Sequence, residues 1–245
     1  MSIYIASHKT TPSPSSDLYK KIALGGNFVD KTDFTDDTGE NISFLNRDYC
    51  ELTATFWLWK NCMDEYIGLC HYRRYFNFIP LQSNNSLIEA TFTDEVQTIL
   101  EDQKQEQNLK KILNRYDLII PRTLYEPISL EHSYKNSHRM DEWDIMIKNL
   151  DLLYGKNRHG LDVDNRFHLG NMIICKKNTF DLYASQLFFI INNVYRELGA
   201  ADPIENARYQ PYRYPGYLAE RFTTAFINAN RLSYYEAQVI NISGI

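Results

Sequence analysis

The sequence has few cysteines, and they do not form a metal-binding pattern. Its four cysteines, Cys50, Cys62, Cys70 and Cys175, include no CxxC pair, and the chain has no HExxH motif. Zinc sites and disulfide frameworks are recognised by such regular spacings. The cysteines are therefore expected to be buried, reduced thiols, as in a cytoplasmic protein.

The chain also lacks the segments that direct a protein into or across a membrane. Residues 1–17 have neither the basic nor the apolar part of a signal peptide. No apolar run reaches the ~18 to 20 residues that a membrane-spanning helix needs. We expect a cytoplasmic protein, for which peripheral association with the inner face of the cytoplasmic membrane remains compatible with the sequence.

A strong positive charge is missing as well. The formal net charge is −5, and no long basic run or RNP-like motif occurs, so the protein is not expected to bind nucleic acid. What the chain does have is a hydrophobic content of 44% and 18 tyrosines. Tyrosine favours surfaces that are half apolar and half wet, which suit a sugar, a protein partner or a membrane face.

Strand-like and helix-like segments alternate along the 245 residues. Strands are expected at residues 2–7, 65–76, 117–121 and 166–177, with a short edge strand at 236–242. Helices are expected at residues 51–61, 93–116, 178–198 and 216–231, the first of them capped by Asn46 or Asp48. Residues 131–155 read as a loop that leads into a helix. This alternation predicts one α/β domain whose mostly parallel central sheet is flanked by helices.

One stretch, EYIGLCHYRRYFNF at residues 65–78, joins an apolar strand to a histidine and two arginines. In an extended chain, His71 and Arg73 would share one face and Arg74 the other. Ligands of α/β sheets bind beyond the carboxyl ends of strands, and arginine forks suit phosphate oxygens. The residues therefore predict an anion site. The alternative is that the arginines pair with acidic neighbours on a solvated rim.

Three polar segments are further candidate sites. The loop at residues 36–43, which includes Asn41 and Ser43, has the groups to bind ribose, a base or a sugar, or forms an ordinary turn. Asp162 and Asp164 form a DxD motif of the kind that holds Mg²⁺ or Mn²⁺, although such a short match is common by chance. In residues 131–144, His138 or Asp141 is a candidate general base, and the alternative is the polar start of a helix.

Several of these segments together resemble a known family. The segments NISFLNRDYCELTATFWLWKN and YIGLCHYRRYF resemble the signature of the DUF4422 family of capsular and exopolysaccharide synthesis proteins, a group of bacterial glycosyltransferases. YDLIIP, ISLEHSYKNSHRMDEWD, LGNMIICKKNTFDLY and GYLAERF are similar to later family segments. The residues that match are Asn41, Ser43, Asn46, Glu51, Trp57, Lys60, Asn61, His71, Tyr72, Arg73, Arg74, Tyr75, Tyr134, His138, Asn171, Met172, Glu220 and Arg221.

This resemblance implies sugar transfer from a nucleotide sugar on a GT-A-like, Rossmann-type domain. The donor is expected to be UDP-galactose, as pyranose or furanose, and the acceptor a lipid-linked glycan or oligosaccharide. Residues 1–245 would form a single domain, with about 1–120 on the donor side and about 121–245 on the acceptor side.

Within that frame the matched residues receive expected roles. The donor diphosphate is assigned His71, Tyr72, Arg73, Arg74, Asn41, Ser43 and Lys60. Acceptor-side or structural roles go to Tyr134, Asn171, Glu220 and Arg221. Cationic side chains are expected to replace a metal at the diphosphate, as preorganised charge would, so no cofactor is expected to be required; Mg²⁺ or Mn²⁺ at Asp162 and Asp164 is the alternative.

Two other classes of protein fit parts of the sequence. A non-catalytic glycan-binding or scaffolding component of a polysaccharide assembly complex would explain the tyrosines and the lack of an unambiguous DxD. A glycoside hydrolase would need two carboxylates at a defined separation, which a sequence does not reveal.

Overall fold

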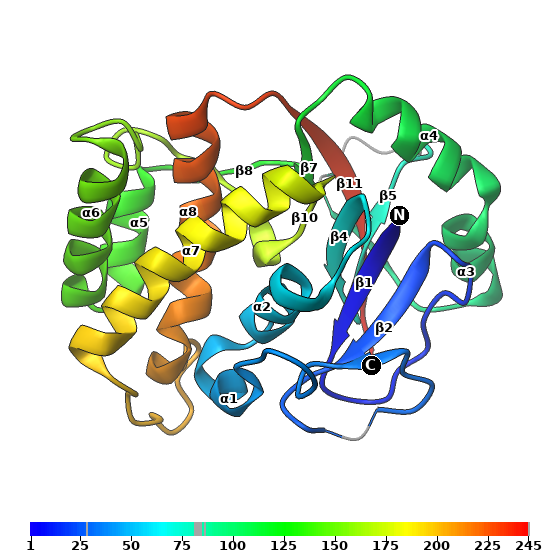
Figure 1. The fold of residues 1–245 in the computed structure, drawn as a ribbon, viewed down its shortest axis with the longest axis horizontal. Helices are drawn as coiled ribbons and strands as arrows, with labels where there is room; N and C mark the ends of the chain where they lie inside the picture. The colour runs from blue at the N-terminus through cyan, green and yellow to red at the C-terminus, as the bar shows by residue number, and fades with distance from the viewer. Residues whose placement is uncertain (28, 81–84, 86, 245) are drawn as a thin grey trace.

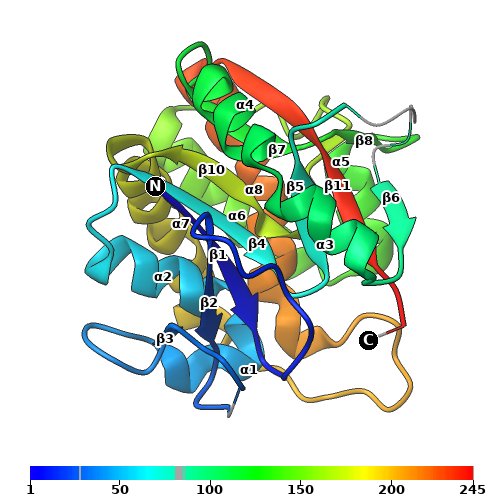
Figure 2. The same ribbon diagram turned by 90° about the vertical axis from the view of Figure 1, so that its right-hand side faces the viewer.

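The computed structural model describes residues 1–27, 29–80, 85 and 87–244. Within these residues a nine-stranded sheet is covered by helices on both faces (Figures 1 and 2). Its strands are β1 (Ser2–Ser7), β2 (Tyr19–Ala23), β3 (Phe34–Thr35), β4 (Tyr66–His71), β5 (Arg74–Asn77), β6 (Leu87–Ala90), β7 (Leu118–Pro121), β10 (Ile173–Lys176) and β11 (Tyr234–Ile242). A small separate sheet pairs β8 (Leu124–Tyr125) with β9 (Arg166–Phe167).

Eight α-helices lie among the described residues. They are α1 (Asn46–Tyr49), α2 (Leu52–Asn61), α3 (Asp94–Glu101), α4 (Gln103–Leu113), α5 (Leu130–Ser137), α6 (Met140–Tyr154), α7 (Lys177–Leu198) and α8 (Tyr214–Asn230). The α/β class predicted from the sequence is confirmed, and the long helices α7 and α8 lie where the 3.6-residue periodicity placed them.

The sheet is mixed, so the prediction of a mostly parallel sheet is not confirmed. Parallel ladders join β1 to β2 and β4, β2 to β3, and β11 to β6 and β7. Antiparallel ladders join β4 to β5 and β10, β10 to β7, and β11 to β5. The connection from β4 to β5 is only two residues long, and a parallel pairing needs a crossover of a dozen residues or more.

Residues 65–76 form a hairpin rather than one strand. β4 ends at His71, Tyr72 and Arg73 make the turn, and β5 begins at Arg74, which pairs directly with His71. Directly paired residues of neighbouring strands face the same side. Arg74 therefore shares the face of His71, and Arg73 is exposed at the tip. The predicted alternation of these side chains is wrong because the chain reverses direction at the turn.

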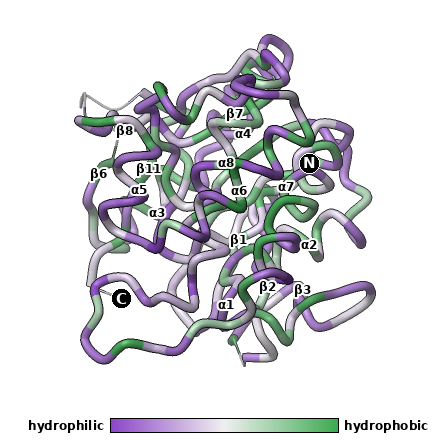
Figure 3. The backbone as a smooth tube through the Cα atoms, turned by 90° about the vertical axis from the view of Figure 1, so that its left-hand side faces the viewer, coloured by the Kyte–Doolittle hydropathy of each residue, from purple (hydrophilic) through white to green (hydrophobic). Residues whose placement is uncertain are grey.

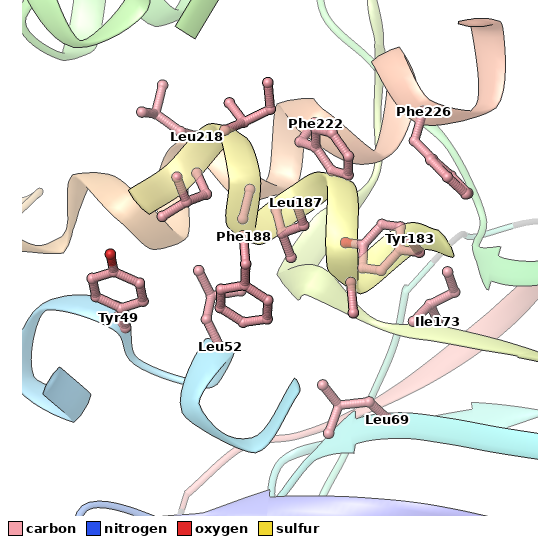
Figure 4. Packing of buried hydrophobic residues seen from close by; sticks show 14 of the residues in the cluster. Tyr49, Leu52, Leu69, Ile173, Tyr183, Leu187, Phe188, Leu218, Phe222 and Phe226 are labelled. Atoms are coloured by element: carbon pink, nitrogen blue, oxygen red, sulfur yellow. The ribbon is translucent and has the colours of Figure 1, made fainter. Parts of the chain in front are cut away.

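Two hydrophobic cores lie on opposite faces of the sheet, and alternation along β1 supplies both. Tyr4 and Ala6 pack into the larger core, between the sheet and α2, α6, α7 and α8. Ile3 and Ile5 pack into the smaller core beneath α3 and α4. Figure 4 shows how the helices of the larger core bring their apolar side chains onto the sheet. In the hydropathy view, hydrophobic stretches follow α2 and the outer loops are mostly hydrophilic (Figure 3).

Local backbone features interrupt the helix that follows the polar loop. α1 and α2 are separated at Cys50, whose backbone has φ 52° and ψ −129°. The predicted capping by Asn46 or Asp48 is wrong, since Glu51 precedes α2 without a capping side chain. The amide of Asn46 instead donates to the carbonyl oxygen of Cys50 and to the hydroxyl of Thr53. The break places Cys50 and Glu51 on a bend rather than inside a helix.

Two further stretches also differ from the sequence-based expectation. The single helix predicted at 93–116 is two helices, because Asp102 is extended and its carboxylate caps α4 by accepting from the backbone N–H of Lys104. The loop predicted before α6 contains α5, which Ser129 caps by accepting from the N–H of His132.

The predicted edge strand near the C-terminus lies inside the sheet. β11 spans nine residues and pairs with β5, β6 and β7. All four cysteines are free, and three of them are buried, with Cys50 half-buried. Within the described ranges, every helix is too short or too polar to cross a bilayer.

Candidate functional site

A cavity of about 860 Å³ opens where several strands end. Ala6 at the end of β1, Leu24 just after β2 and His71 at the end of β4 all line it. Ligands of α/β folds bind at this edge of the sheet. Most of the remaining lining comes from the turn after β4, from α1 and the α1–α2 bend, and from residues 126–221. The cavity therefore joins the first part of the chain to the segments around β8, α5 and α8.

The cavity wall is rich in arginine. Five arginines line it together with three glutamates: Arg47, Arg73, Arg74, Arg213, Arg221, Glu51, Glu126 and Glu220. Among the described residues, no carboxylate lies within ion-pairing distance of Arg73 or Arg74. Burial, followed by the charges of Lys9, Arg73 and Arg213, lowers the pKa of His8 at the same wall. The alternative that the two adjacent arginines pair with acidic neighbours is not what the structure shows.

His71, Arg74 and Gly170 lie together in the cavity lining, and we call these three residues the cavity floor. Gly170 lies in a short turn between β9 and β10 with φ 79° and ψ 23°, in the left-handed region that favours glycine. A Cβ atom on Gly170 would lie 3.2 Å from Nη1 of Arg74 and 3.5 Å from Cε1 of His71. Both predicted anion-binding side chains therefore pack directly against a bare stretch of backbone.

His71 offers a neutral imidazole to this floor. Burial lowers its pKa, and the charge of Arg74 acts in the same direction, while the charge of Glu51 opposes them. Its Nε2 atom is buried and has no hydrogen-bond partner among the described residues. A buried polar atom without a partner is uncommon in folded proteins, and a bound ligand would satisfy it. The positive charge of the floor comes from the arginines.

Two glutamates beside the cavity floor form hydrogen bonds with the protein itself. Glu51 accepts a hydrogen bond of 2.7 Å from the amide of Asn171. Glu220 accepts one of 2.8 Å from the N–H of Gly170 and pairs with Arg221 at 3.1 Å. Burial raises the pKa of Glu220. Asn171, Glu220 and Arg221, which the resemblance placed on the acceptor side or in the structure, thus hold the turn that carries Gly170.

Arg221 lines the cavity, and Tyr134 lies behind it. Arg221 is only 7% exposed, and its guanidinium packs 4.6 Å from the ring centroid of Phe167 and 5.4 Å from that of Tyr134. Its Nε atom has no hydrogen-bond partner in the described part of the chain. Tyr134 is fully buried and donates a hydrogen bond of 2.6 Å to Glu142, so it contacts the cavity only through Arg221 and His138.

The two candidate bases lie in different surroundings. His138 lines the cavity, with its ring stacked 4.6 Å from that of Tyr217 and tilted 4.5 Å from that of Tyr134. Burial, aided by the charge of Arg221, lowers the pKa of His138 to about 4. Asp141 lies in the first turn of α6, outside the cavity lining, and forms an ion pair with Arg139. The structure therefore brings His138 to the cavity and not Asp141.

The polar loop and Lys60 support the site from outside the cavity. Ser43 donates a hydrogen bond of 2.6 Å to the buried carboxylate of Asp36, and Asn41 makes short-range contacts within its own turn. Lys60 pairs with Glu40 at 3.3 Å and packs over the ring of Trp59. These contacts fit a structural role, because the three predicted donor-binding residues Asn41, Ser43 and Lys60 do not line the cavity.

The DxD motif does not fit a metal site in this fold. Asp164 accepts hydrogen bonds from the guanidinium of Arg166 and from the amide of Asn228. Asp162 is exposed, and neither aspartate lines the cavity. Among the described residues, no three His, Cys, Asp or Glu side chains gather as metal ligands. Asp164 instead ties the loop before β9 to α8.

Sequence reasoning missed several cavity residues. Tyr209 and Arg213 lie in the tyrosine-rich segment ARYQPYRYPG, whose density of aromatic and basic residues is a signal that could have been used. Glu126 lies beside β8 with no surrounding motif, and Gly170 becomes informative only once the turn is seen.

Comparison with known proteins extends this description. The sequence matches the profile of the family described as Domain of unknown function (DUF4422) over residues 2–231, which confirms the resemblance seen in the motifs. No curated protein matches the chain. Among solved structures, the chain is similar to the apo structure of the bifunctional glycosyltransferase WbbM, with 25% identity and a TM-score of 0.84. The match covers 99% of this chain and 45% of that one, so the chain spans less than half of WbbM.

Proposed function

This chain belongs to the DUF4422 family, and we propose that it is a glycosyltransferase that moves a sugar from a nucleotide sugar to a glycan acceptor. The fold supports the transferase class, because it aligns over almost its whole length with part of a bifunctional glycosyltransferase. The observation that carries the proposal is the arginine-rich cavity at the strand ends. A nucleotide sugar has a diphosphate with two negative charges, which such a wall would bind.

The arginines would act on the leaving group. As the bond between the anomeric carbon and the diphosphate breaks, negative charge grows on the departing nucleoside diphosphate. Fixed positive charges stabilise such a transition state because they need no reorganisation during the reaction. Arg74, held against Gly170, and Arg73 at the hairpin tip are the groups we assign to this charge, with His71 donating or accepting a hydrogen bond beside them.

We further propose that this charge replaces a metal ion. In a GT-A-like domain, of which this chain would be an example, a DxD would follow a central strand. Here β4 ends at His71, and the turn of Tyr72 and Arg73 follows it and leads to Arg74. Asp162 and Asp164 are poorly placed for the metal role, as their contacts described above indicate.

The identities proposed for the donor and the acceptor rest on the family resemblance. We propose UDP-galactose, as pyranose or furanose, as the donor, and a lipid-linked or oligosaccharide acceptor in the synthesis of a capsule, exopolysaccharide or O-antigen. Residues up to about 120 would bind the donor and the later residues the acceptor. The reaction would take place in the cytoplasm, with the protein peripheral to the inner face of the membrane when the acceptor is lipid-linked.

Nucleotide binding tests the proposal without knowledge of the acceptor. UDP and UDP-, GDP- and dTDP-sugars are compared by thermal shift, because a ligand that binds only the native state raises the melting temperature. We expect a UDP-sugar to stabilise the wild-type protein equally with and without EDTA. Arg74→Ala should lose this stabilisation, and Arg139→Ala, a matched arginine outside the cavity, should keep it.

Different results would point elsewhere. Stabilisation that requires Mn²⁺ and is lost in Asp162→Ala would contradict charge replacement by the arginines. A non-catalytic glycan-binding protein would bind a saccharide and release no nucleotide from any donor.

A further inference from the structure

One wall of the cavity differs in chemistry from the arginine-rich floor. Glu126, Ser133, Ser137, His138, Tyr209 and Tyr217 form it, and we name it the aromatic wall. Glu126 directly follows β8, Ser133 and Ser137 lie in α5 and His138 follows α5, while Tyr209 lies in the segment before α8 and Tyr217 in its first turn, so none belongs to the β1–β5 part of the chain. We propose that the aromatic wall is a saccharide-binding subsite, with Glu126 hydrogen-bonded to hydroxyl groups of the sugar and Tyr209 packed against its ring.

The rings of the aromatic wall and of Tyr134 form a continuous cluster, in which the rings of His138 and Tyr217 are stacked. His138 lies between Tyr134 and Tyr217, with ring centroids 4.5 and 4.6 Å apart. Tyr209 meets His138 at 5.1 Å and the edge of Tyr217 at 5.8 Å. Tyr209 is 41% exposed, which makes it the most open of these rings. A rigid aromatic surface that is apolar on its faces and polar at its hydroxyl suits the mixed surface of a sugar.

Glu126 supplies an uncommitted carboxylate to the same wall. Its backbone is fixed from both sides, since its N–H donates to the carbonyl of Asn165 at 2.9 Å and its own carbonyl accepts from the Asn165 amide at 2.8 Å. Its carboxylate forms no hydrogen bond or ion pair with the described residues, in contrast to Glu51 and Glu220. A positioned carboxylate without a protein partner is a strong acceptor for ligand hydroxyls.

The aromatic wall itself carries a single formal charge, although arginines lie beside it. His138 is neutral near pH 7, because burial lowers its pKa to about 4. The formal charge among the residues of this wall is therefore the single negative charge of Glu126. Like charges repel, so a diphosphate would be directed to the arginines, and a neutral polyhydroxyl ligand would be favoured beside Glu126. Arginines border the wall: Arg208 lies 5.3 Å from the ring centroid of Tyr209, Arg213 6.0 Å from that of Tyr217, and Arg221 is paired with Glu220.

The two chemistries meet in one cavity, which is what a transfer reaction requires. A donor on the arginines and a saccharide on the aromatic wall would share about 860 Å³, a volume within the range of ligand pockets. The subsite presupposes the transferase function proposed above and gives its acceptor a place. It also provides an alternative to His138 for binding the reacting hydroxyl, because a group with so low a pKa is a weak proton acceptor.

Saccharide binding can be measured separately from transfer. Methyl glycosides of galactose, glucose, mannose and N-acetylglucosamine are titrated into the UDP-saturated protein, and saturation-transfer NMR gives each Kd. We expect at least one glycoside to bind the wild type. Glu126→Gln and Tyr209→Ala should raise its Kd about tenfold or more, whereas Tyr209→Phe, which keeps the ring, should stay close to wild type.

Controls and outcomes separate this subsite from the proposed function. Tyr125→Ala removes a ring that is 70% exposed, next to Glu126 but outside the cavity, and should bind as the wild type does. If no glycoside binds, or if Glu126→Gln and Tyr209→Ala bind as tightly as wild type, the subsite assignment is overturned. Nucleotide release without glycoside binding would contradict the saccharide subsite and support the transferase function. Glycoside binding without nucleotide release from any donor would support the saccharide subsite and contradict the transferase function.

Discussion

Replacing Gly170 by alanine tests whether the cavity floor holds Arg74 in place for a phosphate ligand. The backbone there has φ 79° and ψ 23°, and a left-handed conformation costs a residue with a Cβ about 1–2 kcal/mol. For a chain of this size that loss lowers the melting temperature by about 2–8 °C. The new Cβ would also lie 3.2 Å from Nη1 of Arg74 and 3.5 Å from Cε1 of His71. The flexible guanidinium would move away, and its contact with a phosphate would be lost.

Gly160→Ala is the matched control. Gly160 has φ 71°, and a Cβ there would lie 3.1 Å from Nδ2 of Asn228, so its strain and crowding are similar. It lies outside the cavity lining. We expect similar losses of stability from both variants, but a Kd for UDP raised about tenfold only in Gly170→Ala, since one charged hydrogen bond is worth about 1.5–3 kcal/mol. Equal UDP affinity in the two variants, measured by calorimetry, would refute the role assigned to the floor.

Three further substitutions separate structure from binding. Asp164→Ala should lower the unfolding free energy, measured in denaturant, by about 2–4 kcal/mol, because it leaves the partly buried Arg166 without its carboxylate. The affinity for UDP should not change. Weaker UDP binding at equal stability would show that Asp164 binds a ligand. Lys60→Ala should change stability by less than about 1 kcal/mol and leave the Kd for UDP unchanged, and a large rise in that Kd would return Lys60 to the donor site. His138 has a native pKa of about 4, below the ordinary value of 6.5, so the unfolded chain binds more protons between these values. The unfolding free energy of wild type relative to His138→Gln should therefore fall by up to about 3 kcal/mol as pH drops from 6.5 to 4, and a pH-independent difference would contradict the lowered pKa.

The periodicity of apolar residues in the sequence was sufficient to predict the long helices and the strand β4. The apolar spacing in α7 and α8 identified both helices, and the apolar run before His71 identified β4. Short breaks were not predictable from periodicity. The hairpin at Tyr72 and Arg73 contains no glycine, proline or asparagine to announce a turn, and β11 was taken for an edge because pairing partners far away in the sequence decide its position.

The candidate site was partly predictable. The run from His71 to Arg74 stood out because charge directly follows an apolar strand, and all four residues line the cavity. Asn41, Ser43 and Lys60 were assigned to the donor from their residue types and from the resemblance, yet their hydrogen bonds and ion pair are used within the loop and α2. Glu126 could not be found, because its importance depends on which carboxylates elsewhere are already paired.

Release of UDP from a sugar nucleotide tests the central claim most directly. Purified protein is incubated with UDP-, GDP- and dTDP-sugars, with a mixed glycan acceptor and with or without EDTA, and free nucleotide is measured. The account predicts release from a UDP-sugar that EDTA leaves undiminished, that Arg74→Ala reduces about a hundredfold or more, and that Arg139→Ala leaves unchanged. No nucleotide release from any donor, or release by Arg74→Ala at the wild-type rate, would contradict it.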